Sequence, residues 1–550
     1  MVTVDRISDP ARRPIVEDDF VTVTATAASS TLSRQDRAWL RVQAVACLVT
    51  VGAALSLYSG LIDDAYITFR YSYNLAHFGE YVFNRGEWVE GATNLLWALL
   101  VAPLTLVPAR IETSVLTLSL VCLAWAAWRS TQCARALGAG PVQALLAAAL
   151  LATNLAFLHT MTSGLEAPLF AALMAEMMLR LLRGQIVKAS VCSSLLFLTR
   201  PEAVVFGPLI VLAGWRWGGA PARRAWLGLS LWLATVLGVT LLRWLIYGSF
   251  VPNSVIAKMT DLTTLSHSRF GARYVLDFWI SAPYLPLIAI GAGLRWLKYM
   301  QQRTGPILAV GVALTGIALS YVVTARNGGD WMPDFRLLSQ YLVLYSLLAA
   351  WLLSRRVERG SAALTYAIAG LCIVFGAAQV ARGPVADPGF GHGAGIMHRV
   401  PRMETEDAAF YDAATERLNG RLGAGDVISA EAIGRIGWNL IDARFHDPTG
   451  LMDPYLARHG KLRSFFGSED VNYTLGTVAP RVVLWHSAAH LKSADPAVVQ
   501  RYEMRCYSHC EDTWRMRLVM LRRDQAGALR EAFAGWPAVE IRGGVPSLMP

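Results

Sequence analysis

Two adjacent carboxylates, Asp63 and Asp64, are the clearest candidates for chemistry, because they directly follow the first long apolar run at Leu61-Ile62. An acid at the edge of a membrane is costly and needs a compensating reason. The C-terminal end of a helix carries partial negative charge, so a span ending here would place both acids unfavourably. A carboxylate held there is suited to act as a general base or an electrostatic anchor. Adjacent side chains diverge, so we expect only one to reach the reacting atoms; the plain alternative is a polar stop at the membrane surface.

Cations suited to bind a phosphate occur in other polar strings. Lys258 ends VPNSVIAK, Arg336 ends GGDWMPDFR and Arg200 opens RPEA. Cationic groups stabilise phosphate oxygens, and the glycines of Gly328-Gly329-Asp330 let backbone N–H groups approach an anion closely. The alternatives are snorkelling side chains for Lys258 and Arg336, and a structural ion pair between Arg200 and Glu202.

Other polar residues of these strings are candidate substrate contacts. Glu166 begins an apolar run, where Ser163 could instead make a simple helix cap and the helix dipole favours an acid. None of the acids has spacing diagnostic of a metal site, so we predict no metal ligands, and dependence on a divalent cation stays open. The candidate substrate-binding residues are Glu166, Glu202, Asn253, Asp330, Glu90 and Arg70.

Repeated apolar runs must position these residues. The chain has 550 residues, of which 54% are hydrophobic and only 16% charged, which is too apolar for an ordinary soluble protein. A helix of about 20 apolar residues crosses a bilayer, and several runs approach this length. We therefore expect an α-helical polytopic membrane protein with about eleven transmembrane helices, near residues 39–62, 111–128, 141–159, 165–182, 186–199, 203–215, 225–247, 281–296, 305–324, 337–353 and 362–380.

The basic residues fall in alternate short loops, which the positive-inside rule makes cytoplasmic. They do not form a stripe that could follow a nucleic-acid backbone, so the formal charge of +10 does not predict nucleic-acid binding. The acidic and mixed-charge strings then all lie on the outer side, although the assignment used none of the acids. These strings are LIDDAYITFRYS, TSGLEAP, LTRPEA, YGSFVPNSVIAK and ARNGGDWMPDFR.

Three regions follow from this topology. Residues 1–37 are expected to be a disordered cytoplasmic tail, 38–381 the transmembrane domain with a long first outer loop at 63–97, and 382–550 a soluble extracytoplasmic domain. A helix near 404–422 and strands near 427–431, 482–486 and 515–521 predict a small α/β domain. Cys506 and Cys510 would lie outside, where a disulfide is permitted but not required.

In chain order, the acidic pair, FNRGEWVEGATNLLW, SGLE, RPE, VPNSVIAK and GGDWMPDFR resemble the mycobacterial terminal β-arabinofuranosyltransferase and its relatives. These are glycosyltransferases of the GT-C class, and the resemblance covers roughly residues 55–345. It implies a GT-C fold, a polyprenyl-phosphate-linked sugar donor, and catalytic carboxylates at Asp63 and Asp64. The family has a longer soluble tail, so the resemblance carries no information on the acceptor.

The expected function is transfer of a sugar, with arabinofuranose as the candidate, to a cell-envelope glycan or glycoconjugate. The reaction would take place at the outer face of a bacterial cytoplasmic membrane, with the N-terminus cytoplasmic. Transfer of a different sugar, or to lipid A, a pilin or another protein, is the main alternative. A transporter is disfavoured because the acids gather at one surface and no internal repeat is evident. The stereochemical outcome, inverting or retaining, stays open.

Overall fold

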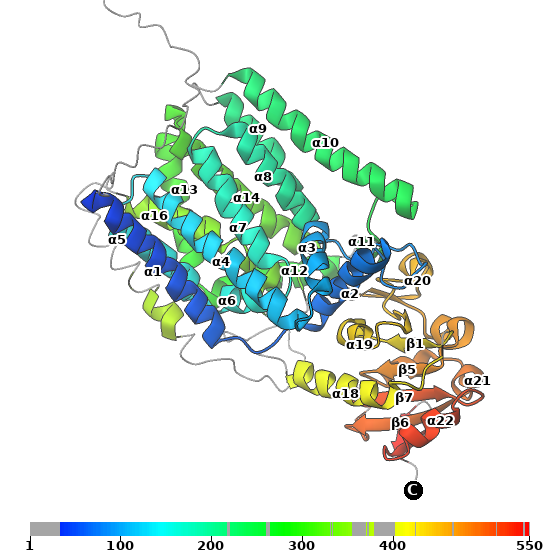
Figure 1. Cartoon of the computed structure of the whole chain (residues 1–550). Coiled ribbons are helices and arrows are strands. Elements are labelled where there is room, and N and C mark those ends of the chain that lie inside the picture. Colours follow the sequence, from blue (N-terminus) through cyan, green and yellow to red (C-terminus); the bar gives the residue numbers. More distant parts are fainter. Residues whose placement is uncertain are drawn as a thin grey trace, which may run out of the picture.

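The computed structural model consists of a helical membrane part and a C-terminal domain built on a β-sheet (Figure 1). It describes residues 33–216, 221–259, 265–330, 332, 334–354, 370, 373–378, 402–423, 425–464, 467–512, 514–542 and 545–548. Most of the predicted tail, most of the predicted span at 362–380 and the start of the predicted soluble domain lie outside these residues.

The membrane part contains helices of very different lengths. They are α1 (Arg34–Ser56), α2 (Asp63–Phe78), α3 (Leu95–Val101), η1 (Ala102–Leu106), α4 (Ile111–Ala136), α5 (Pro141–Ala152), α6 (Leu155–Thr162), α7 (Ala167–Leu182), α8 (Ile186–Thr199), η2 (Pro201–Val205), α9 (Phe206–Arg216), α10 (Ala222–Tyr247), α11 (Asn253–Met259), α12 (Leu265–Ser281), α13 (Tyr284–Tyr299), η3 (Met300–Gln302), α14 (Gly305–Arg326), α15 (Arg336–Ser339) and α16 (Leu342–Leu353).

Four of the described helices, α1, α4, α10 and α14, are long and apolar enough to cross a membrane, and counting two bent helix pairs as single spans raises the number to six. Eleven full-length spans are therefore not found among the described residues. The predicted span at 141–159 is broken into α5 and α6, which meet at 67°. The break has a local cause, because the side chain of Asn154 accepts a hydrogen bond from the N–H of Phe157 and so starts a new helix.

Some predicted spans are short helices buried inside the bundle. In α7 every residue except Arg180 is buried, which is typical of a helix surrounded by others. It packs most extensively against α4 and α8. An apolar run can therefore mark a position in the protein interior as well as contact with lipid.

The C-terminal domain contains a seven-stranded mixed sheet in the order β2-β1-β5-β7-β6-β8-β9, as the α/β prediction anticipated. The parallel pairs are β1 with β2 and with β5; the other pairs are antiparallel. The strands of this sheet are β1 (Val427–Ala430), β2 (Arg444–His446), β5 (Val482–Trp485), β6 (Tyr502–Ser508), β7 (Arg517–Arg522), β8 (Ala538–Arg542) and β9 (Val545–Leu548), and β3 (Leu462–Ser464) pairs separately with β4 (Gly467–Glu469). Its helices are α18 (Arg402–Leu418), α19 (Ile433–Asn439), α20 (Pro454–His459), η4 (Tyr473–Val478), η5 (Ala489–Ser493), α21 (Pro496–Val499) and α22 (Gly527–Ala532).

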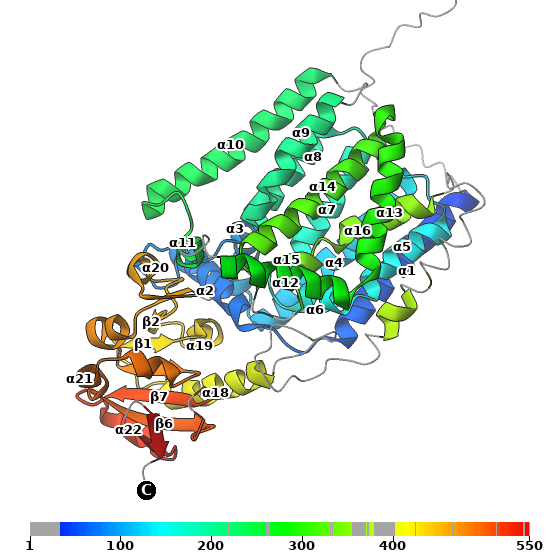
Figure 2. The same ribbon diagram turned by 180° about the vertical axis from the view of Figure 1, so that it is seen from behind.

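The C-terminal domain sits at one end of the helical bundle, beside α2 and α11 (Figures 1 and 2). The first outer segment, predicted as a loop at 63–97, begins with the regular helix α2, which packs along α19. Tyr71 and Phe83 of this segment belong to the same hydrophobic core as Ile433 and Phe445 of the domain. The two parts are therefore joined by a shared core, and α2 is the element that connects it to the site.

Candidate active site

Asp63 and Asp64 occupy the first turn of α2, not the end of α1, which stops at Ser56. The expectation that they close the first span was therefore wrong. A helix begins after an extended residue, Ile62, so the acids lie at the positive end of a helix dipole. Their position is electrostatically favourable, which removes the objection that the predicted geometry raised.

The two carboxylates face different partners, as the divergence of neighbouring side chains predicts. Asp64 binds the guanidinium of Arg336, with its Oδ2 3.0 Å from Nη1. Asp63 instead accepts hydrogen bonds from the backbone N–H groups of Gly434 at 2.9 Å and Arg435 at 2.8 Å, in the first turn of α19. Asp64 thus faces the membrane part and Asp63 ties α2 to the C-terminal domain. The side chain of Asp64 is 34% exposed, so its carboxylate can be reached from outside.

Arg336 is the centre of the charged group around Asp64. Its guanidinium also binds Asp330, whose side chain is buried, and α15 begins at Arg336 itself. The two preceding residues have φ angles of +67° at Asp334 and +48° at Phe335, which side-chain-bearing residues adopt at a cost. The chain therefore accepts local strain to place Arg336 beside both acids.

Lys258 of α11 adds a second cation to this group. Lys258 is exposed at the surface, and partial loss of water around its ammonium lowers the pKa of this group. The charge of Arg336 acts in the same sense, and Asp330 and Asp64 act in the opposite one. Lys258 is thus a solvent-accessible cation within electrostatic reach of the Asp64–Arg336 pair.

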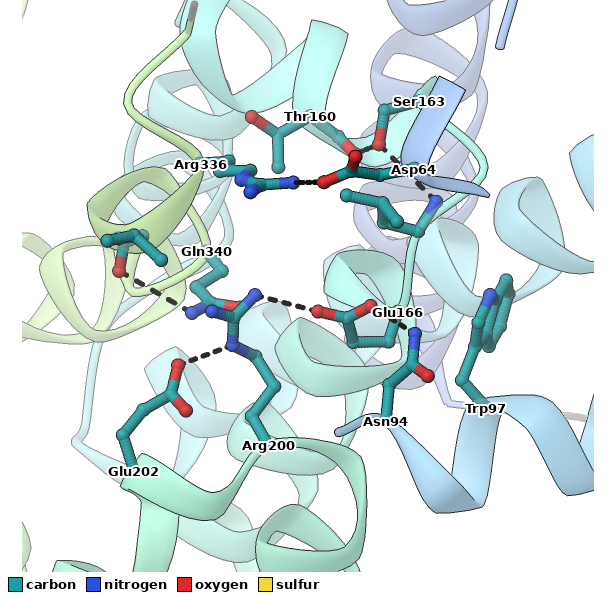
Figure 3. A network of polar contacts seen from close by, with 12 residues as sticks. Asp64, Asn94, Trp97, Thr160, Ser163, Glu166, Arg200, Glu202, Arg336 and Gln340 are labelled. Carbon is teal, nitrogen blue, oxygen red and sulfur yellow. Dashed lines mark hydrogen bonds and ion pairs between the residues drawn. The ribbon is translucent and has the colours of Figure 1, made fainter. Parts of the chain in front are cut away.

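A second set of ion pairs lies next to the first (Figure 3). Arg200 binds Glu166 at 2.7 Å and Glu202 at 2.5 Å, and Asn94 donates to the other carboxylate oxygen of Glu166 at 2.8 Å. Glu166 occupies the N-cap position of α7, where the helix dipole favours an acid, but Ser163 ends α6 and does not cap α7 as the alternative expected. The ion pair of Arg200 with Glu202 is present, as the structural alternative predicted. The charges of Arg200 and Arg336 interact, which connects the two sets.

Three other candidates lie apart from the Asp64–Arg336 pair. Arg70 donates to the carbonyls of Gly437 and Ala443 in the C-terminal domain, and Asn253 donates to the carbonyls of Gly450 and Leu451. Both residues therefore bridge the two parts of the protein.

Glu90, the third of these, forms an ion pair with Arg243 near the end of α10. It is also tied to α11, because its backbone carbonyl accepts from the N–H of Asn253 at 2.8 Å. This contact relates Glu90 to the helix that carries Lys258.

The two glycines before Asp330 end α14. Both have positive φ, +81° at Gly328 and +79° at Gly329, and the N–H of Gly329 donates to the carbonyl of Thr324 at 2.9 Å. A Cβ on Gly329 would stand 2.8 Å from the Cβ of Tyr274. For Gly329 the close approach is thus to the Tyr274 side chain, and its N–H caps a helix.

Sequence reasoning missed several polar residues. Arg243 carried a usable signal, since a charge inside an apolar helix needs a partner. Asn94, which holds Glu166, and His159, whose Nδ1 lies 3.3 Å from Asp334, gave no such signal because their partners are distant in the chain. Among the described residues no group of three or more His, Cys, Asp and Glu side chains is arranged to hold a metal ion.

No protein-family model matches the chain, and no curated protein matches its sequence. Solved structures do match. The archaeal oligosaccharyltransferase AglB from Archaeoglobus fulgidus, in complex with an inhibitory peptide and a dolichol-phosphate, is 12% identical, with 87% of this chain and 74% of that one covered and a TM-score of 0.53.

ArnT from Cupriavidus metallidurans bound to undecaprenyl phosphate is 14% identical over 89% of this chain and 99% of that one, with a TM-score of 0.51. ArnT in the apo state is 13% identical over 88% of this chain and 98% of that one, with a TM-score of 0.50. At these identities the likeness concerns the fold, which is the GT-C arrangement that the sequence predicted. Membership of the arabinofuranosyltransferase family stays a prediction.

Proposed function

We propose that the protein is an integral membrane glycosyltransferase that moves a sugar from a polyprenyl-phosphate donor to a glycan or glycoconjugate at the outer face of the cytoplasmic membrane. The observation that carries the proposal is the Asp64–Arg336 pair, with Lys258 within electrostatic reach. It combines an accessible carboxylate with two cations in one place. The GT-C fold supports the same conclusion, because the AglB and ArnT structures of this fold hold a dolichol-phosphate and undecaprenyl phosphate.

The roles of the charged residues follow from where charge changes during transfer. Asp64 takes the proton of the acceptor hydroxyl while the oxygen of that hydroxyl forms a bond to the anomeric carbon of the donor sugar. The bond between that carbon and the phosphate oxygen breaks, and its electron pair leaves with the polyprenyl phosphate. Arg336 and Lys258 stabilise the departing phosphate, which needs no separate general acid. General-base assistance of this kind contributes roughly 10²- to 10⁴-fold in rate.

Asp63 has a different role in this proposal, although the family resemblance assigns both acids to catalysis. Its two oxygens are engaged by the backbone of α19, so it orients the first turn of α2 and with it Asp64. The second set of ion pairs, around Arg200, contributes an additional cation and fixes Glu166 and Glu202 near the donor. Arg70 and Asn253 act indirectly, by holding the C-terminal domain against α2 and α11.

Arabinofuranose is the sugar we infer, from the ordered motifs shared with the arabinofuranosyltransferases. If the β configuration of the donor is retained in the product, Asp64 acts as a nucleophile or as a stabiliser of an ion pair in place of a base. A protein acceptor is the alternative with a specific observation behind it, since the AglB structure holds a peptide. The N-terminus would be cytoplasmic and the C-terminal domain extracytoplasmic.

The test is sugar transfer by the purified protein in detergent. Polyprenyl-phosphoryl-arabinofuranose with radiolabelled sugar is incubated with a short arabinan acceptor, and wild type is compared with Asp64→Asn. Asp442→Asn is the matched control, because the side chain of Asp442 is 86% exposed. We expect transfer by wild type and the control and a loss of at least about 100-fold in Asp64→Asn. Full activity of Asp64→Asn would refute the assignment, and inactivity of wild type would refute this choice of donor and acceptor.

A further inference from the structure

A large pocket lies where the membrane part meets the C-terminal domain, on the side of α2 that the proposed mechanism does not use. Its volume is about 830 Å³, within the range of roughly 300–1,000 Å³ typical of small-molecule sites. Its walls are the segment between α1 and α2, η1, the start of α4, and α18 and α19 of the domain. The lining residues that matter here are Tyr58, Tyr66, Arg110, Glu112, Arg435 and Trp438.

The polar groups of this pocket include both hydrogen-bond donors and acceptors. The Tyr66 hydroxyl donates to Oε1 of Glu112 at 3.2 Å. Burial, and after it the charge of Glu112, raises the pKa of Tyr58, so the carboxylate of Glu112 acts electrostatically on this second phenol of the lining as well. Arg435 is neutralised by a bidentate pair with Asp412 at 2.9 and 2.8 Å. With Arg110 balancing Glu112, the lining carries almost no net charge.

An aromatic wall completes the pocket. Trp438 of α19 is partly buried and is held edge-on by Phe69, with ring centroids 6.1 Å apart, and by Tyr73 at 6.0 Å. Both contacts come from α2, so the indole is fixed by the same helix that carries Asp63 and Asp64. A rigid aromatic ring beside phenols and a carboxylate offers an apolar surface together with hydrogen-bonding groups.

The pocket is also close to the candidate active site. Ser59, Gly60 and Ile62 line this pocket. They also line a cavity of about 50 Å³ whose other walls include Asp334 and Arg336. The short chain segment before Asp63 is therefore the shared wall between the two spaces. Asp64 follows this segment in the first turn of α2, and its partner Arg336 lines the smaller cavity.

We propose that this pocket is the binding site for the terminal sugar residues of the acceptor, an uncharged oligosaccharide. Sugar hydroxyls both donate and accept hydrogen bonds, which matches the phenols, the carboxylate and the arginines. The lipid phosphate of the donor is assigned to Arg336, which lines the cavity on the other side of the shared wall, and to Lys258. The inference rests on the proposed function, because it assigns the acceptor to one side of Asp64 and the donor to the other.

Direct binding tests the proposal separately from catalysis. Wild type in detergent is titrated with a panel of neutral arabino-, manno-, galacto- and gluco-oligosaccharides and, in parallel, with polyprenyl phosphate. The variants are Glu112→Gln and Tyr66→Phe, which keep the shape of the pocket, and Lys258→Gln, which changes the cationic side. Thermal unfolding of each variant is measured to confirm that it is folded.

We expect at least one oligosaccharide to bind, about tenfold more weakly to Glu112→Gln and Tyr66→Phe and unchanged to Lys258→Gln. Polyprenyl phosphate should show the reverse pattern. The proposal is overturned if no oligosaccharide of the panel binds wild type, if the pocket variants bind it as tightly as wild type, or if they lose polyprenyl phosphate instead. Oligosaccharide binding without transfer from polyprenyl-phosphoryl-arabinofuranose would refute the choice of donor and leave this site standing.

Discussion

Replacing Arg70 by lysine would test how the C-terminal domain is held against the membrane part. Arg70 is 2% exposed, and besides a long bond to the carbonyl of Leu440 at 3.5 Å its guanidinium donates to three carbonyls at short range, those of Phe83 at 2.7 Å, Gly437 at 2.5 Å and Ala443 at 2.6 Å. The last two belong to the C-terminal end and the exit of α19, where a helix has unsatisfied carbonyls. α2 therefore binds both ends of α19, with Asp63 at the positive end and Arg70 at the negative end.

Lysine keeps the buried charge but replaces the planar fork of donors by a single ammonium. If it satisfies one carbonyl, two charge-assisted hydrogen bonds are lost, each worth about 1.5–3 kcal/mol. We therefore expect the free energy of unfolding to fall by about 3 kcal/mol or more. For a domain of the size of the C-terminal domain, this loss corresponds to a decrease in Tm on the order of 6–12 °C, at roughly 2–4 °C per kcal/mol.

The assay is thermal unfolding in detergent together with limited proteolysis between the two parts. Arg85→Lys is the matched control, because Arg85 joins the same two regions through Asp442 at 3.5 Å with both side chains largely exposed, 48% and 86%. An exposed pair contributes only about 0–1 kcal/mol, so this change should leave Tm nearly unaltered. Equal, small effects of Arg70→Lys and Arg85→Lys would show that the buried guanidinium of Arg70 does not hold the C-terminal domain against α2.

Three further predictions concern the acid at the junction, the second set of ion pairs and the cysteines. Burial raises the pKa of Asp63 to about 6, with the charge of Asp64 in the same sense and the N–H bonds of α19 opposing. Because the folded pKa exceeds the unfolded one, this group's contribution to stability is present at acid pH and lost as pH rises through about 6. Tm should therefore fall more between pH about 5 and about 7 in wild type than in Asp63→Asn, and identical slopes would contradict this. Glu166→Gln replaces one of the two carboxylates that pair with the buried Arg200 by a neutral amide. It should lower the free energy of unfolding by about 2 kcal/mol, measured by thermal unfolding, and an unchanged Tm would contradict a stabilising role of this ion pair. Cys506 and Cys510 are joined by a disulfide, so neither should react with maleimide until reductant is added, and mass spectrometry of the unreduced protein would expose an error.

The sequence predicted elements well where the pattern is local. The strands near 427–431, 482–486 and 515–521 correspond to β1, β5 and β7, since each is a short apolar run bounded by turn residues. Among the described residues fewer helices than predicted are long enough to cross a membrane, because several apolar runs form short helices, such as α7 with 16 residues.

The site was predicted less completely, because its geometry depends on contacts between distant residues. The sequence suggested that one of the two acids reaches the reacting atoms, but not which one. That choice follows from the partners: Arg336 lies 272 positions from Asp64, and Gly434 lies 371 positions from Asp63. Arg70 was expected to bind substrate, and its carbonyl partners Gly437 and Ala443 lie more than 360 positions along the chain. No local pattern encodes such pairings.

The most direct measurement of which acid acts on the acceptor compares the rates of sugar transfer by Asp63→Asn and Asp64→Asn under identical conditions, with Tm recorded for both. We predict that Asp64→Asn loses transfer while its Tm stays within a few degrees of wild type. Asp63→Asn should keep measurable transfer and change the pH dependence of Tm. Loss of transfer in Asp63→Asn alone, with Asp64→Asn fully active, would contradict the assignment of Asp64 as the residue that acts on the acceptor.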